Sequence, residues 1–68
     1  NQLKSDLEIE TFKKSLALNP NQATVYLALA QIYKQQGNTE EAINILTAAL
    51  TLSNDDSLKK ELNLLKSY

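Results

Sequence analysis

Three pairs of carboxylates are the residues in this chain that most resemble catalytic groups, because two neighbouring carboxylates can share acid and base roles. They are Glu8 with Glu10, Glu40 with Glu41, and Asp55 with Asp56. The sequence has no histidine and no cysteine, so it lacks the usual general base, the thiolate nucleophile and the commonest transition-metal ligands. The last two pairs also stand at expected helix starts, where the helix dipole favours carboxylates. We therefore expect no enzymatic activity, no metal site and no cofactor.

The charge balance argues against nucleic-acid and membrane partners. The chain has 68 residues, seven lysines, no arginine and a formal net charge of −1. Nucleic-acid-binding proteins carry a basic surplus and use arginine for bidentate contacts, so we expect no nucleic-acid partner. No run of about 18 apolar residues is present, so we expect no membrane insertion.

The chain is short for an independent domain. Chains of this size bury only about 60% of their unfolded surface, so we expect marginal stability. The sequence begins at Asn1 rather than at a methionine, which leads us to expect a piece of a longer protein.

Apolar residues at helical spacing predict four helices. The first ends before Pro20, the second spans about residues 22–36, the third about 39–52, and the fourth begins near residue 56. No alternating strand pattern is present, and the loops are short, so we expect an all-α fold with antiparallel neighbours.

Specific residues are expected to mark the helix ends. Pro20 cannot continue a helix, and Asn21 is a good candidate to cap the next one. Gly37, the only glycine, fits the left-handed position that closes a helix, and Asn38 and Thr39 can cap the third helix.

Two helical elements recur along the chain. A shift of 34 positions places the first helix on the third, with Ile9, Phe12, Ser15, Leu16 and Leu18 falling on Ile43, Leu46, Ala49, Leu50 and Leu52. A shift of 35 places the second on the fourth, with Leu27, Leu29, Ala30 and Tyr33 falling on Leu62, Leu64, Leu65 and Tyr68. The extra residue is assigned to the loop at 53–57, where length is tolerated. We call the element formed by the first and third helices B and the element formed by the second and fourth helices A, so the helices follow the order B-A-B-A.

Residues 23–56 resemble one tetratricopeptide repeat, which has aromatic-x2-Leu-small-x2-Tyr followed by Ala-x3-large. These places hold Tyr26, Leu29, Ala30, Tyr33, Ala42 and Leu46. The resemblance implies antiparallel helix hairpins stacked as a short right-handed solenoid. It also implies that 1–22 is the second helix of a preceding repeat, 23–56 a complete repeat, and 57–68 the first helix of a following or capping repeat. We expect Ala30 and Ala42 to be buried, because small residues let paired helices approach closely.

The same resemblance implies a function. The first helix of each pair lines a concave face that binds a peptide or a partner helix, and this role makes the chain a non-catalytic scaffold. The expected peptide-binding residues are Thr24, Leu27, Gln31, Lys34, Lys59, Leu62 and Lys66. Three of them are lysines, so we expect the partner to be acidic, although a row of lysines is also typical of an ordinary solvated face.

Two alternatives stay open at this point. Apolar residues at the two ends of the stack predict self-association, in which the chain is a spacer or a homo-oligomer; they are Leu7, Ile9 and Phe12 at one end, and Leu62, Leu65 and Tyr68 at the other. A plain four-helix bundle is the other alternative, but it does not require the repeat of 34 positions.

Overall fold

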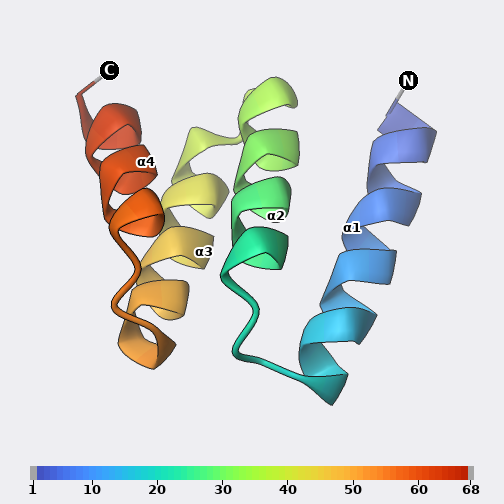
Figure 1. Ribbon diagram of the computed structural model, residues 1–68. Helices are drawn as coiled ribbons and strands as arrows, with labels where there is room; N and C mark the ends of the chain where they lie inside the picture. Colours follow the sequence, from blue (N-terminus) through green and yellow to red (C-terminus); the bar gives the residue numbers. More distant parts are fainter. Residues whose placement is uncertain (1, 68) are drawn as a thin grey trace.

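A computed structural model describes residues 2–67 and shows four α-helices joined by short loops. They are α1 (Gln2–Leu18), α2 (Ala23–Gln35), α3 (Thr39–Leu52) and α4 (Asp56–Lys66). Each helix runs antiparallel to the one before it (Figure 1). The expected all-α fold of antiparallel helix hairpins is confirmed.

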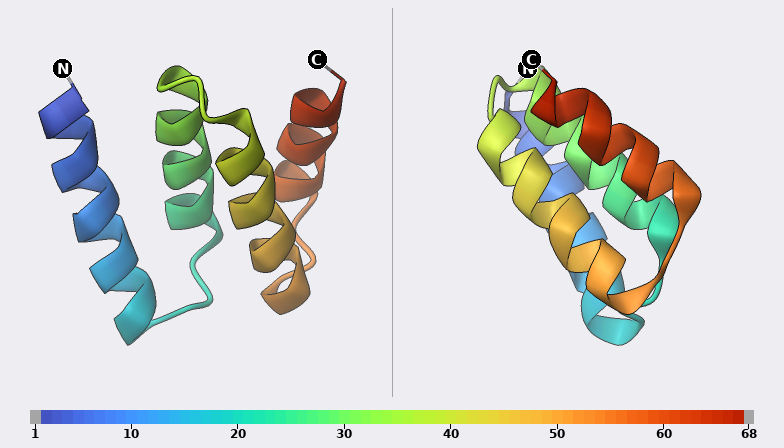
Figure 2. Two further views of the ribbon diagram at one scale, coloured as in Figure 1. Left: turned by 180° about the vertical axis from the view of Figure 1, so that it is seen from behind. Right: turned by 90° about the vertical axis from the view of Figure 1, so that its left-hand side faces the viewer.

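The helices form a tandem array rather than a closed bundle. α2 packs most extensively on α3, α3 packs on α4, and α1 packs on α2. α2 and α4 also contact each other on the same side of α3 (Figure 2, right). Within the described residues, α1 contacts neither α3 nor α4, so the four-helix bundle is wrong.

Gly37 closes α2 as the sequence predicts. Its φ angle is +79°, in the left-handed region that favours glycine. The N–H of Asn38 donates to the carbonyl of Tyr33 (2.8 Å), and the N–H of Gly37 donates to that of Lys34 (3.0 Å). These two bonds form a Schellman motif, which satisfies carbonyls that the helix end would otherwise leave unpaired.

The caps at the helix starts differ from the prediction. Gln22, not Asn21, is the N-cap residue of α2, and its side chain does not cap that helix. Instead its amide Nε2 donates back to the carbonyls of Ser15 (3.0 Å) and Asn19 (2.7 Å), at the end of α1. Asn38 occupies the N-cap of α3 without a side-chain bond.

Among α2, α3 and α4, only α4 has a side-chain cap at its start. The Asp55 carboxylate accepts hydrogen bonds from the backbone N–H groups of Ser57 (2.8 Å) and Leu58 (3.4 Å). A capped first turn fixes where α4 begins, and therefore which of its residues face α3.

The core lies where α2 and α3 meet, and α4 extends it. Ala30 and Ala42 are buried as expected, together with Leu29, Leu46 and Ala49. Small residues at the α2–α3 contact let the backbones approach closely, while leucines and tyrosines fill the space around them. The remaining members of the buried cluster are Ile9, Tyr26, Ile32, Tyr33, Leu58, Leu62 and Leu65.

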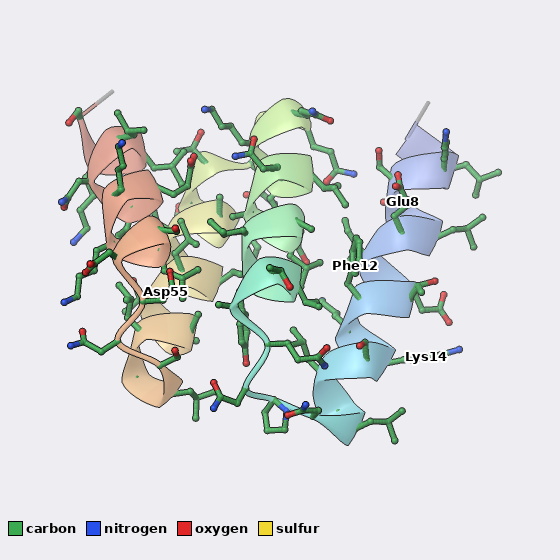
Figure 3. All side chains as sticks on the ribbon, in the orientation of Figure 1. Glu8, Phe12, Lys14 and Asp55 are labelled. Atoms are coloured by element: carbon green, nitrogen blue, oxygen red, sulfur yellow. The ribbon has the colours of Figure 1, made fainter. Side chains whose placement is uncertain are left out.

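Four of the six residues expected to form apolar ends are buried or half-buried within the chain itself. Ile9, Leu62 and Leu65 belong to the core, and Phe12 is half-buried against it. Figure 3 shows Phe12 pointing from α1 towards α2. Only Leu7 is exposed as predicted, and Tyr68 lies outside the described residues. For Ile9, Phe12, Leu62 and Leu65 the prediction was wrong, because α2 and α3 already cover the inner sides of α1 and α4.

The repeat of the A helices is 33 positions, not 35. α2 begins at Ala23 and α4 begins 33 positions later, at Asp56. The loop before α4 is one residue shorter than the loop before α2, so this repeat is one position shorter than the repeat of 34 that relates α1 to α3. At this shift two core residues, Leu29 and Ile32, fall on two others, Leu62 and Leu65. The shift of 35 instead matched Leu29, which is fully buried, with Leu64, which is exposed.

Candidate interaction surface

Four of the expected binding residues form one row along α2. Thr24, Leu27, Gln31 and Lys34 are spaced at i, i+3, i+7 and i+10, which places them on one side of the helix. Thr24 and Gln31 are exposed, while Leu27 and Lys34 are half-buried. Exposed polar side chains therefore alternate along the row with side chains that pack partly against the rest of the molecule.

Lys34 joins α2 to α4. Its Nζ lies 3.9 Å from a carboxylate oxygen of Glu61, and the Glu61 side chain is 16% exposed. This contact fixes the side of α4 that borders the α2 row. It also places a negative charge beside the lysine that was expected to help make the surface positive.

The structure does not bring Lys59, Leu62 and Lys66 to this row. Leu62 is 8% exposed and belongs to the core. Lys59 and Lys66 are exposed, but they are two and five residues from Glu61. At about 100° per residue, both lie on another side of α4. The three lysines therefore do not form one positive groove.

Leu64 was missed as a surface residue. It is 48% exposed and stands one turn after Glu61, on the same side of α4. The shift of 33 would have found it, because that shift places Gln31 on Leu64. We call the surface formed by these residues the α2–α4 face; its members are Thr24, Leu27, Gln31, Lys34, Glu61 and Leu64.

The chemistry of this face is that of contact rather than reaction. No enclosed cavity and no cluster of metal-ligating side chains occurs within residues 2–67. None of the described helices is both long and apolar enough to cross a lipid bilayer. The face offers an amide, a hydroxyl, an ion pair and two leucines, which suit hydrogen bonding and apolar contact with another chain.

Comparison with known proteins identifies the family. A model of the tetratricopeptide repeat matches residues 9–62, which include most of α1, all of α2 and α3, and part of α4. The chain belongs to the tetratricopeptide repeat family. No curated protein and no solved structure matches it.

Membership in the tetratricopeptide repeat family sets the general class of function. These repeats generally mediate protein–protein interaction, and they are generally non-catalytic. Two of the three carboxylate pairs lie at helix starts, since Asp55 caps α4 with Asp56 in its first turn, and Glu40 and Glu41 lie in the first turn of α3. Helix-start positions explain these acids without any reaction.

Proposed function

We propose that this tetratricopeptide repeat protein is a non-catalytic scaffold that docks a peptide or a partner helix on its α2–α4 face. The observation that carries the proposal is Leu64, a large apolar side chain that stays half-exposed beside polar groups of two helices. Docking sites commonly combine an apolar anchor point with a few polar groups that orient the partner.

The proposed division of the chain supports this arrangement. Residues 23–56 would form the complete repeat, since α2 and α3 pack together most extensively. Residues 1–22 would supply the second helix of a preceding pair, and residues 57–68 the first helix of a following or capping pair. In this division α2 and α4 are equivalent helices, so a partner crossing both would meet the same element twice.

The partner of the α2–α4 face needs apolar as well as polar groups. Lys34 and Glu61 oppose each other, so the face has little net charge for an acidic partner to recognise. An extended segment with an aliphatic side chain could contact Leu27 and Leu64, and its backbone could bond to Gln31.

An acidic partner remains the second candidate, at a different place. Lys59 and Lys66 are exposed and seven residues apart, with Asn63 between them on the same side of α4. A segment rich in carboxylates would therefore meet this lysine side of α4 rather than the α2–α4 face.

Binding measurements on charge and leucine variants test the two candidates. Peptides selected from a random display library against the chain serve as probes, and their dissociation constants are then measured in solution. We expect Leu64→Glu to weaken binding about tenfold or more, a loss of about 1.4 kcal/mol. The control Lys14→Glu, on the far side of α1, should leave affinity within about twofold (Figure 3).

The outcomes separate the candidates. Loss of binding in Lys66→Glu, with Leu64→Glu unchanged, would assign the partner to the lysine side of α4 and refute docking on the α2–α4 face. Loss in both Lys34→Glu and Leu64→Glu, with Lys66→Glu unchanged, supports the proposal.

A further inference from the structure

One ion pair supplies the charge of the α2–α4 face. Lys34 and Glu61 are the only charged residues among the members of this face, and Lys34 Nζ lies 3.9 Å from a carboxylate oxygen of Glu61. The residues one turn before and one turn after each of them, on its own helix, are all uncharged. The charge that this face presents to a bound segment therefore depends on these two side chains.

The pair is less open to water than the ion pair on α1. The Glu61 side chain is 16% exposed and the Lys34 side chain 37% exposed. The side chains of Glu10 and Lys14, which pair on α1, are 62% and 76% exposed. Water and salt screen exposed charges strongly and partly buried charges much less. Removal of one partner from the Lys34–Glu61 pair therefore leaves a charge that is less screened than the charge left by the same removal on α1.

The two charges of the pair act in opposite senses on a charged partner. Lys34 attracts a carboxylate and the neighbouring Glu61 repels it, and a basic side chain meets the reverse. A charged group of either sign would also lose water on entering the contact, without a net opposite charge to compensate for that loss. An uncharged segment avoids this cost, so the intact pair favours it over an acidic or a basic one.

We propose that the Lys34–Glu61 pair makes the α2–α4 face select segments that carry no net charge where they cross the pair, and that Glu61 is the residue that disfavours acidic segments. Selectivity arises from a repulsive element as well as from attractive contacts, and Glu61 supplies the repulsion here. This inference rests on the proposed docking function, because it specifies the partner of the same face.

Binding of matched peptides tests the proposal. The starting probe is a peptide from the display library whose binding is lost in Leu64→Glu, so that it is known to depend on the α2–α4 face. Each position of the peptide that tolerates Gln is then changed to Gln, Glu and Lys, and the dissociation constants are measured in solution. We expect the original chain to bind the Gln form most tightly, and the Glu and Lys forms within about threefold of each other.

Two substitutions in the chain should change this preference in opposite directions. Glu61→Gln should shift the ratio of the two dissociation constants about fivefold in favour of the Glu form, at the peptide position nearest the pair. Lys34→Gln should shift the ratio about fivefold in favour of the Lys form. The double variant carries neither charge, so its ratio should return to within about twofold of the original value.

Glu10→Gln is the matched control. It changes the net charge of the chain as much as Glu61→Gln does, but it acts at the exposed pair on α1. We expect it to leave the ratio within about twofold of the original value. Circular dichroism verifies that each variant keeps its helices, and Lys34→Gln tests the same pair independently if Glu61→Gln loses them.

The outcomes separate this inference from the proposed function. If the peptide depends on Leu64 but its ratio is unchanged by Glu61→Gln, or is changed as much by Glu10→Gln, the role of Glu61 is refuted and docking on the face stands. Tighter binding of the Glu form than of the Gln form by the original chain would also refute that role. If binding of every selected peptide were independent of Leu64, both proposals would fail.

Discussion

Gly37 is a residue whose role depends on backbone conformation alone. A Cβ added at this position would meet no atom within 4 Å, so space is not the constraint. The constraint is the φ angle of +79°, because residues with a Cβ are strained in that conformation. We expect Gly37→Ala to lower the free energy of unfolding by about 1–2 kcal/mol, measured by urea denaturation. Gly37→Asn should cost less, since asparagine adopts the left-handed region more readily; equal losses would contradict this explanation.

Two adjacent leucines of α4 report which side of the helix is buried. Leu65 is 2% exposed and Leu64 is 48% exposed. We expect Leu65→Ala to destabilise the chain by about 2–5 kcal/mol through loss of core packing. Leu64→Ala should change stability by about 0.5 kcal/mol or less. If urea denaturation showed a larger loss of stability for Leu64→Ala than for Leu65→Ala, the result would favour the repeat of 35 positions.

At the scale of elements, Gln22 connects the end of α1 to the start of α2. Its amide reaches the carbonyls of Ser15 and Asn19 and the hydroxyl of Ser15. We expect Gln22→Ala to cost about 1 kcal/mol and to speed amide hydrogen exchange in α1. Asn21→Ala is the matched control, because Asn21 contributes only its backbone N–H, to the side chain of Asn19. A larger effect at Asn21 would mean that the predicted cap was right after all.

The sequence predicted the helices well and their rotations less well. The breaks at Pro20, Gly37 and residues 53–55 are local signals, and the helices begin and end within about one residue of the expected positions. The rotation of α4 depends on the length of one loop. Leucines at positions 58, 62, 64 and 65 can be aligned with α2 in two ways, so the pattern alone does not decide between them.

The same ambiguity affected the prediction of the candidate site. The row on α2 was predicted from residues within a single helix, so its spacing needed no alignment. Lys59, Leu62 and Lys66 were placed by transferring that row across the loop, and a shift of two residues turns a helix by about 200°. Leu64 and the Lys34–Glu61 contact join two helices, so they depend on this rotation.

At the scale of the whole molecule, the helices differ in how many other helices they contact. α2 contacts all three other helices, whereas α1 contacts α2 alone within the described residues. Local stability follows the number of buried contacts, so α1 should open first. We expect native-state hydrogen exchange to be fastest in α1 and slowest in α2 and α3, measured at a concentration where the chain is monomeric. Slowest exchange in α1 would show that α1 is not peripheral.

An amide chemical-shift map of the chain with a bound peptide tests docking on the α2–α4 face most directly. If the α2–α4 face is the docking surface, the largest shifts should fall at Thr24, Gln31, Lys34 and Leu64, and Leu64→Glu should abolish them. Shifts confined to α1 and α3, or unchanged by that substitution, would contradict the account.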